Sequence, residues 1–353
     1  MEPQAIASQP TVPLRINLNV NQIKKISNDL YDINAVKIKE LNGYDDKNYL
    51  ICHETGKHFV LKIINTVDSE KPEIFDAQSL LLVHLGNHGI QCPKPIKTKN
   101  GKLFEKYSLN SGDHIVRLLK YIDGTILMKV PHCSSLLYQI GETTARMNNV
   151  MKSFKHPAYD SYHSIWMLES VPHVNQFVDA VKDEKRKQLV QTIIKEFITR
   201  ILPVKNTLQK GLIHGDINEQ NIIVDEEKGN YRIKAIIDYG DCHIGCYLYE
   251  LAITMTYMII LAKDIAAGKH VLSGYSSVRK VSDLEYSLLK LCIAARFCQS
   301  LVLGAYTYQQ DPKNTYVLTT AEHGWPLLEK LWEQPDEQLL KIWTTDEFNN
   351  KKI

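Results

Sequence analysis

The sequence predicts an α+β protein with two lobes: a small antiparallel β-rich N-lobe and a larger, mostly helical C-lobe with an embedded hairpin. Its 353 residues are about twice the usual size of one domain. Short runs of β-branched and aromatic residues recur before residue 122, and long stretches with helical patterning follow it. We therefore expect a flexible tail at residues 1–14, an N-lobe at residues 15–121 and a C-lobe at residues 122–353.

The N-lobe pattern predicts an antiparallel meander that one helix interrupts. The turn Glu54-Thr55-Gly56 separates two β-type runs, and leucines crowd the segment before Gly86, which indicates a helix at residues 76–86. The expected strands are residues 35–38, 49–51, 59–64, 102–107 and 114–119.

The C-lobe pattern predicts long helices around one β-hairpin. Residues 222–224 and 231–237 are apolar β-type runs on either side of a polar turn, which is typical of a hairpin. The uncharged stretch from Leu251 to Ala262 is shorter than the roughly 20 residues of a membrane span, so we expect a buried core helix. The expected helices are residues 134–151, 175–208, 246–262, 283–309 and 316–332.

Composition excludes several classes of function. Lys and Arg number 42 against 40 Asp and Glu, so the electrostatic footprint of a general nucleic-acid binder is missing. The seven cysteines form no C-x-x-C pair, which indicates a reducing compartment rather than a disulfide framework. The N-terminal residues contain no apolar signal region. We expect a cytoplasmic protein without membrane or nucleic-acid partners.

The candidate chemistry lies on the hairpin. His214-Gly215-Asp216 precedes it, Asn221 follows five residues after the aspartate, and Asp238 comes directly after the second β-type run. A carboxylate on a tight loop can accept a hydroxyl proton, while an amide oxygen and a second carboxylate can hold Mg²⁺ against nucleotide phosphates. A lone His-Gly-Asp run could simply close a turn, but the second aspartate after one hairpin favours phosphoryl transfer. His214 itself fits an orienting or structural role as well as a chemical one.

These motifs resemble H-R-D-x-x-x-x-N and D-F-G of the protein kinases, with Gly215 in place of the arginine. The run from residue 212 to 225, together with Ile237-Asp238, resembles the aminoglycoside phosphotransferase and choline kinase superfamily, whose fold is protein-kinase-like. The resemblance to the hydroxylysine kinase family is stronger and spans residues 25–345. The segments that carry it are Gly43-Tyr44-Asp45-Asp46-Lys47-Asn48, Val116-Arg117-Leu118-Leu119 and Arg296-Phe297-Cys298-Gln299-Ser300-Leu301-Val302.

The resemblance implies a role for each residue that matches a family motif. Asp216 becomes the proton acceptor, with Asn221 and Asp238 as the ligands of Mg²⁺. Lys62 should reach the α- and β-phosphates, because a lysine within an apolar strand needs an anion nearby; an edge-strand lysine that points to solvent is the alternative. The remaining nucleotide-binding residues are Gly43 in the loop, Leu119 and Tyr121 in the tether, and Asp76 as the partner of Lys62, with Glu73 as the alternative partner.

The resemblance also implies a kinase that phosphorylates 5-hydroxy-L-lysine with GTP, or with ATP, as the donor. Such an acceptor carries two ammonium groups and one carboxylate, so we expect acidic side chains and one cation around it. The candidates are Glu219, Asp241, Glu250 and Arg296. Arg296 fits a substrate carboxylate or an internal ion pair, and Glu250 fits an amine or an internal salt bridge. The alternative functions are a kinase for choline, ethanolamine, homoserine or an aminoglycoside, and a nucleotide-binding pseudokinase.

Overall fold

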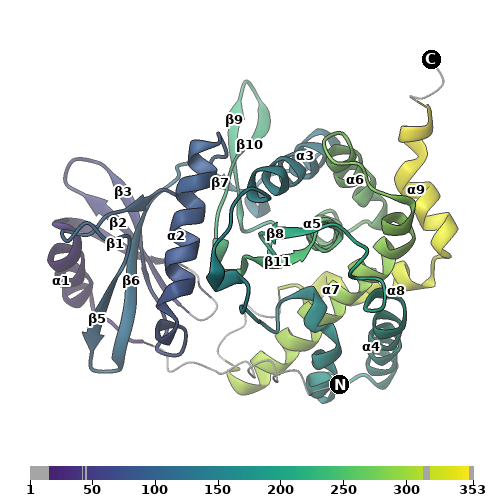
Figure 1. Cartoon of the computed structure of the whole chain (residues 1–353), viewed down its shortest axis with the longest axis horizontal. Coiled ribbons are helices and arrows are strands. Elements are labelled where there is room, and N and C mark those ends of the chain that lie inside the picture. Colours follow the sequence, from purple (N-terminus) through teal and green to yellow (C-terminus); the bar gives the residue numbers. More distant parts are fainter. Residues whose placement is uncertain (1–15, 42, 44–45, 313–318, 350–353) are drawn as a thin grey trace. The chain divides into compact units, whose positions relative to one another are not determined.

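The computed structural model describes residues 16–41, 43, 46–312 and 319–349 (Figure 1). The chain divides into two compact units. Within the described residues, the N-unit comprises residues 16–123 and 156–160, and the C-unit comprises residues 124–155 and 161–349. The tail expected at residues 1–14 lies outside the described residues.

An antiparallel sheet forms the centre of the N-unit. The strand order is β1-β2-β3-β6-β4, and β5 pairs with the other part of β6. The predicted meander is confirmed for β1, β2 and β3, which pair in chain order before β6 joins β3. The strands are β1 Ala35–Leu41, β2 Lys47–His53, β3 His58–Ile63, β4 Pro95–Ile96, β5 Glu105–Leu109 and β6 Gly112–Lys120.

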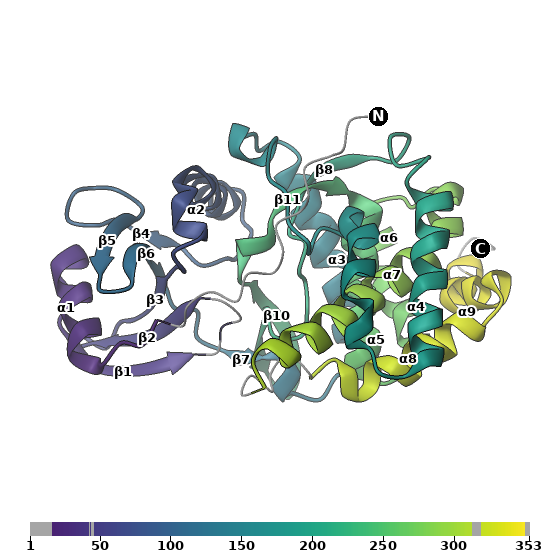
Figure 2. The same cartoon turned by 90° about the horizontal axis from the view of Figure 1, so that it is seen from below.

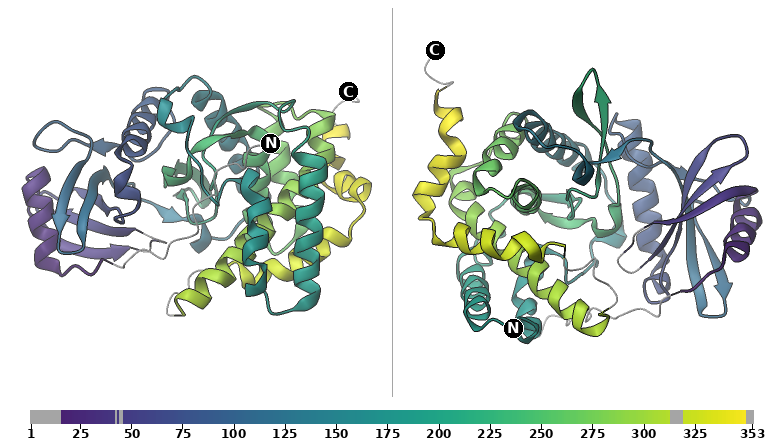
Figure 3. Two further views of the ribbon diagram at one scale, coloured as in Figure 1. Left: turned by 60° about the horizontal axis from the view of Figure 1, so that its bottom comes forward. Right: turned by 180° about the vertical axis from the view of Figure 1, so that it is seen from behind.

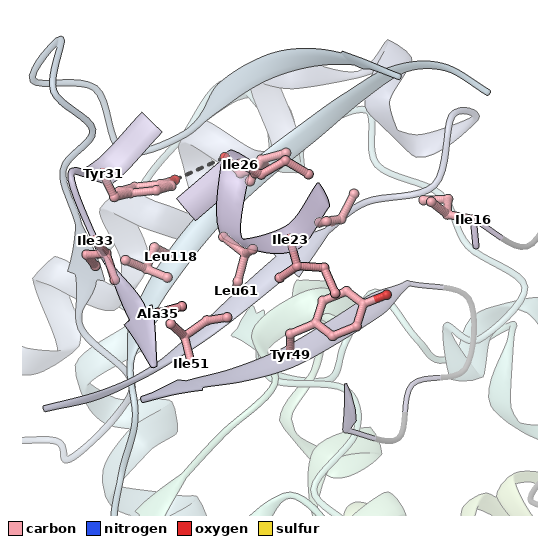
Figure 4. Close-up of a cluster of buried hydrophobic side chains, with 12 residues drawn as sticks. Ile16, Ile23, Ile26, Tyr31, Ile33, Ala35, Tyr49, Ile51, Leu61 and Leu118 are labelled. Carbon is pink, nitrogen blue, oxygen red and sulfur yellow. Dashed lines mark hydrogen bonds between the residues drawn. The ribbon is translucent and has the colours of Figure 1, made fainter. Parts of the chain in front are cut away.

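A helix that the sequence analysis did not include covers this sheet. Helix α1, Val20–Tyr31, begins at a capping box in which Asn19 and Gln22 bond each other's backbone N–H groups. It lies beside β1 (Figure 2). Its Ile23, Ile26 and Tyr31 enter the apolar cluster of Figure 4 with residues of β2, β3 and β6, and the Tyr31 hydroxyl donates to the carbonyl of Val116 at 3.2 Å. The N-unit therefore has its own hydrophobic core.

Helix α2, Pro72–Asn87, is the helix expected within residues 76–86. It begins four residues earlier than predicted, because Pro72 occupies its first turn, where a missing N–H costs nothing. It ends one residue beyond Gly86. Its buried side chains include Phe75 and Gln78, and Gln78 accepts a hydrogen bond from the guanidinium of Arg117 on β6 at 2.8 Å.

The strands of the C-unit build the loops that carry the motif residues. The predicted hairpin is confirmed: β9, Ile222–Glu227, pairs antiparallel with β10, Asn230–Ile236. The short strand β7, Thr125–Ile126, pairs with the other side of β9. Separately, β8, Lys210–Ile213, pairs with β11, His243–Cys246. His214 therefore directly follows β8, and residues 237–242, which include Asp238, connect β10 to β11.

Helices surround the almost completely buried helix α5 (Figure 3). Helices α3, α6 and α7 pack against it, and the uncharged stretch from Leu251 to Ala262 is indeed a core segment. Helix α7 is long and apolar enough to cross a membrane by length and composition, but 89% of its most apolar window is buried inside the protein. The helices of the C-unit are α3 Ser134–Met151, α4 Glu184–Glu196, α5 Tyr247–Ala262, α6 Gly268–Ser276, α7 Asp283–Gln310, α8 Ala321–Glu333 and α9 Asp336–Asn349.

One predicted helix of the C-unit is wrong. Residues 175–208 do not form a continuous helix, because a 3₁₀ segment ends at Ala180 and a new helix, α4, begins after Asp183. The Asp183 side chain accepts the N–H groups of Lys185 and Arg186, which makes it an N-cap. The helical turns then end before Pro203. Of the helix expected at residues 316–332, residues 316–318 lie outside the described residues, and α8 begins at Ala321.

Candidate active site

The loop after β8 presents Asp216, and a buried glutamate fixes its backbone. Glu250, in the first turn of α5, accepts the backbone N–H of His214 with one carboxylate oxygen and that of Gly215 with the other, the latter at 3.1 Å. Glu250 has no exposed surface. Its burial raises the pKa of Glu250 to about 7, although the two N–H donors act in the opposite direction.

This environment corrects one expectation for Glu250. Both oxygens are engaged with backbone N–H groups and the side chain is shielded from solvent, so a substrate amine has no access to it. Glu250 positions the loop rather than lining an acceptor site.

Gly215 is required by the close approach of the segment that follows β10. Its φ of +81° lies in the left-handed region, which glycine adopts without steric cost. A Cβ at this position would lie 2.7 Å from the carbonyl oxygen of Asp241 and 2.8 Å from the His243 ring. An arginine, as in the protein-kinase motif, does not fit here.

His214 connects the two halves of the motif. Its Nδ1 accepts the backbone N–H of Asp216 at 3.3 Å, so Nε2 carries the proton and donates to the carbonyl of Ile237 at 3.0 Å. Burial lowers the pKa of His214, which keeps the ring neutral. The ring also lies edge-on to Tyr239, with centroids 4.7 Å apart. His214 therefore has the orienting role that the sequence analysis left open.

The carboxylate of Asp216 is held by three side chains. Its Oδ2 accepts one hydrogen bond from Asn218 and one from Asn221, each at 2.9 Å. Its Oδ1 forms an ion pair with Nη2 of Arg296 at 3.0 Å. The Asp216 side chain remains 22% exposed. It is thus rigidly oriented and still open to a ligand.

Asn221 and Asp238 are brought together through the backbone. The carbonyl of Asn221 accepts the N–H of Ile237 at 2.9 Å, which places the start of β9 beside the residue before Asp238. The Asn221 amide nitrogen donates to the carbonyl oxygen and to Oδ2 of Asp216. Since both acceptors are oxygens, the amide orientation is fixed, and Oδ1 is the Asn221 atom that could coordinate a metal ion. Asp238 has a φ of +61°, an uncommon conformation that occurs at functional sites.

These donors fit Mg²⁺. A carboxylate and an amide oxygen are hard ligands, and Mg²⁺ is usually held by one or two carboxylates together with substrate phosphates and water. Among the described residues, no group of three or more His, Cys, Asp or Glu side chains could form a complete protein cage. The side chains of Asn221 and Asp238 therefore fit the partial ligand set that a metal-nucleotide complex needs.

Glu219 and Asp241 lie near this centre. The Oε2 atom of Glu219 is buried and has no hydrogen-bond partner among the described residues. Burial and the nearby Asp216 raise the pKa of Glu219 to about 7. The backbone of Glu219 is fixed because its carbonyl accepts the N–H of Met128 at 3.0 Å. Asp241 accepts the Nδ1 hydrogen of His243 through its own carbonyl at 2.7 Å.

In the N-unit, Lys62 lies on β3 and is 8% exposed. The edge-strand alternative is wrong, because β3 lies between β2 and β6. The positive charge of Lys62 acts on the carboxylate of Asp46, whose pKa is nevertheless raised by burial. Asp46 also accepts the backbone N–H and the side-chain amide of Asn65, at 3.1 and 3.3 Å.

The other nucleotide-binding candidates also lie in the N-unit. The half-exposed carboxylate of Asp76 lies 3.4 Å from Nε2 of His156, so its pairing with Lys62 stays a prediction, as does the alternative with Glu73. Leu119 is buried opposite Val60, and the N–H of Tyr121 donates to the carbonyl of His58 at 3.1 Å.

The predicted loop segment from Gly43 to Asn48 is described only in part. Tyr44 and Asp45 lie outside the described residues. A Cβ at Gly43 would lie 2.4 Å from the carbonyl oxygen of Asp46, so the backbone at these two positions is closely packed.

Two groups of residues near Asp216 were not predicted from the sequence. Asn218, two residues after Asp216, bonds the Asp216 carboxylate and caps the following turn through the N–H of Gln220 at 2.8 Å. An asparagine in a loop is typical of such a turn, so the sequence indicates this role. Gln299, three residues after Arg296, also contacts it but was not predicted as a site residue. The contact of Trp166 with Arg296 could not be predicted, because the two residues lie 130 positions apart in the chain.

Comparisons with known proteins identify the family of the chain. Residues 37–282 match the model of a phosphotransferase enzyme family. The hydroxylysine kinase of Xenopus laevis is 33% identical, with 94% of this chain and 95% of that protein covered. The hydroxylysine kinase of Bos taurus is 31% identical, with 91% of each covered.

Solved structures show the same fold. A microcompartment-associated aminopropanol kinase has a TM-score of 0.72 at 17% identity, with 92% of this chain and 100% of that chain covered. An amicoumacin kinase in complex with AMP-PNP and Ca²⁺ has a TM-score of 0.66, also at 17% identity, with 91% and 97% covered. The predicted protein-kinase-like fold is thereby confirmed. From its match to the family model and its identity to these relatives, the chain belongs to the hydroxylysine kinase family of phosphotransferases and is a small-molecule kinase that acts on an alcohol group.

Proposed function

We propose that the protein transfers the γ-phosphate of GTP to the side-chain hydroxyl of 5-hydroxy-L-lysine. The observation that carries the transfer step is the Asp216 carboxylate, which Asn218, Asn221 and Arg296 orient while it stays 22% exposed. The acceptor is proposed from the relatives named hydroxylysine kinase, which match this chain over nearly their whole length.

The chain's own residues divide the work of phosphoryl transfer. Asp216 orients the acceptor hydroxyl and takes its proton, while Asn221 and Asp238 would hold Mg²⁺, which would supply charge neutralisation for the phosphates. Lys62 contacts the α- and β-phosphates, with Asp76 or Glu73 as its acidic partner. Gly43, Leu119 and Tyr121 contact the nucleotide through the loop and the tether. Because phosphoryl transfer needs little covalent assistance, positioning and charge account for the catalysis.

Glu219 and Asp241 recognise the amines of the acceptor. Oε2 of Glu219 supports this role, since it is a buried acceptor without a partner among the described residues, next to the proton acceptor. An ammonium group would supply the missing donor and favour the ionised carboxylate. The acceptor is then held by its two charged ends, and the hydroxyl that lies between these ends reaches Asp216.

We place the enzyme in the cytoplasm. All seven cysteines are free thiols in the structure, and five of them are buried. This state matches a reducing compartment, in which disulfides are rare.

A coupled assay that crosses GTP and ATP with a panel of acceptors tests the proposal. The panel contains 5-hydroxylysine, choline, ethanolamine, homoserine and an aminoglycoside, with lysine as the control that lacks the hydroxyl. We expect 5-hydroxylysine with GTP to give the highest kcat/KM. Acceptors that lack one of the two amines should fall behind by up to about 10⁴-fold, because a buried acidic partner is left empty.

Three other outcomes each overturn a different part. Another preferred alcohol overturns the acceptor, and faster turnover with ATP overturns only the donor. If the protein binds nucleotide but turns over none of the alcohols, the pseudokinase alternative replaces catalysis.

A further inference from the structure

Arg296 is enclosed in the C-unit with its charge directed at Asp216. It is 1% exposed, and Nη1 donates to the carbonyl of Trp166 at 3.0 Å and to Oε1 of Gln299 at 2.8 Å. The guanidinium carbon lies 5.5 Å from the ring centre of Trp166 and 5.3 Å from that of Tyr257. A buried guanidinium is stable only when a carboxylate compensates its charge, and Nη2 meets Oδ1 of Asp216 at 3.0 Å.

This arrangement does not suit recognition of a substrate carboxylate. Such recognition uses two parallel N–H donors on one open edge of the guanidinium. Here Nη1 is saturated by Trp166 and Gln299, and Nη2 already serves Asp216. Nε has no hydrogen-bond partner among the described residues, but it is shielded from solvent and a ligand cannot reach it in this conformation.

The hydrogen bonds on Asp216 distinguish its two oxygens. A carboxylate has about four lone-pair positions, two on each oxygen. Asn218 and Asn221 occupy both positions on Oδ2, whereas Arg296 occupies one on Oδ1. The position that remains for a new donor is therefore on Oδ1, on the part of Asp216 that Arg296 orients.

We propose that Arg296 is a positioning residue that holds Oδ1 of Asp216 as the atom that accepts the acceptor's hydroxyl proton, rather than an anchor for the substrate carboxylate. In the step it supports, the hydroxyl oxygen bonds to the γ-phosphorus and the hydroxyl proton passes to Oδ1. The bond from the γ-phosphorus to the bridging oxygen breaks, and the nucleoside diphosphate leaves with that electron pair. The inference rests on the proposed function for the identity of the acceptor.

Steady-state kinetics of Arg296→Met and Arg296→Lys test the proposal. Arg296→Met removes the donors at similar volume, and we expect kcat to fall by about 10²-fold, with the KM for hydroxylysine changed by less than about threefold. Arg296→Lys keeps the charge, but its single nitrogen cannot reproduce the planar fork of donors that serves these acceptors, so its kcat should lie between those of the wild type and Arg296→Met. A rise of more than about tenfold in the acceptor KM with kcat preserved identifies Arg296 as a carboxylate anchor and overturns the proposal.

A matched control separates positioning from general stability. Arg186 also forms an ion pair, with Glu329 at 2.8 Å, and stacks on a tryptophan, Trp325, at 5.2 Å, in the same unit but outside the site. Arg186→Met should lower the melting temperature and leave kcat per nucleotide-binding site unchanged. If both Arg→Met variants show wild-type kcat per binding site, Arg296 is merely structural and the proposal fails.

A double-mutant cycle with Asp216→Asn gives an independent answer, because it needs only a relative rate. If Arg296 acts through Asp216, Asp216→Asn combined with Arg296→Met should be no slower than Asp216→Asn alone. If the kcat loss of the double variant equals the product of the losses of the two single variants, the proposal is overturned. The cycle runs on whichever alcohol the wild type phosphorylates, so a wrong acceptor overturns the proposed function without affecting this result.

Discussion

The carboxylate of Glu250 accepts the backbone N–H of Gly215 at 3.1 Å, although the two residues lie 35 positions apart in the chain. Its other oxygen accepts the N–H of His214. A core helix thus holds the catalytic loop by two backbone hydrogen bonds to one side chain. The position of Asp216 therefore depends on α5 as well as on the strand that precedes it.

Glu250→Gln should weaken this connection. A glutamine offers one oxygen, so one of the two N–H groups faces an NH₂ group, and an unsatisfied buried donor costs about 1–3 kcal/mol. We expect a lower melting temperature and a lower kcat, with the acceptor KM unchanged. An isolated rise in the acceptor KM would instead restore the amine role that its burial argues against.

The difference in stability between the wild type and Glu250→Gln should depend on pH with a defined sign. The pKa of Glu250 is raised to about 7 in the fold, so the folded protein holds this proton more tightly than the unfolded chain does. The contribution of Glu250 to stability is then largest at low pH and declines as the pH rises toward about 7. Melting temperatures measured between about pH 5 and pH 8 should show the gap between wild type and Glu250→Gln narrowing as the pH rises; a widening gap contradicts the assignment.

Gly215→Ala and Gly229→Ala form a matched pair. Both glycines have a φ near +80°, but a Cβ meets nothing within 4 Å at Gly229 and lies 2.7 Å from the Asp241 carbonyl at Gly215. Both variants bear the cost of a left-handed alanine, about 1 kcal/mol. Only Gly215→Ala should also displace the catalytic loop and reduce kcat by about 10²-fold or more. Equal kcat in the two variants would show that the loop tolerates the clash.

The local parts of the site could be predicted from sequence, because a hairpin brings its own ends together. Asp216, Asn221 and Asp238 lie within one β-strand pair and its flanking loops, so their spacing predicts that their segments lie close together. No local spacing rule predicts that Arg296 contacts Asp216, because the two residues lie 80 positions apart in the chain. That contact depends on how α7 packs, which a single sequence does not specify.

The fold errors have similarly local causes. Helix α1 was missed although Asn19 and Gln22 carry its capping-box signal, so this error comes from a signal that was present but not used. The break at Asp183 was missed because residues 173–202 contain no proline or glycine that would signal it, and the cap determines where α4 begins.

Asp238→Ala should separate metal binding from base chemistry. Loss of this carboxylate removes the proposed ligand of the metal, so nucleotide affinity measured by calorimetry with Mg²⁺ should fall by about tenfold or more. Asp225→Ala is the control, since Asp225 is an exposed carboxylate on β9 that forms an ion pair with Lys234 at 3.0 Å. Identical affinities in wild type and Asp238→Ala would remove Asp238 from the metal site.

Glu219→Gln tests recognition of the acceptor amine. The pKa of Glu219 is raised to about 7, so the side chain takes up a proton as the pH falls from about 8 to about 6 and loses the charge that attracts an ammonium group. For the wild type we therefore expect the KM for hydroxylysine to rise several-fold over this interval. The amines themselves stay protonated throughout most of this pH interval, and the KM for nucleotide serves as the internal reference.

In Glu219→Gln the acceptor KM should already be high at pH 8 and should change little with pH, because a neutral amide replaces the titrating group. Glu226→Gln, at an exposed carboxylate on β9, should behave as the wild type does. If Glu219→Gln keeps both the wild-type acceptor KM and its pH dependence, the unpartnered oxygen of Glu219 does not face the substrate, and the amine must be recognised elsewhere.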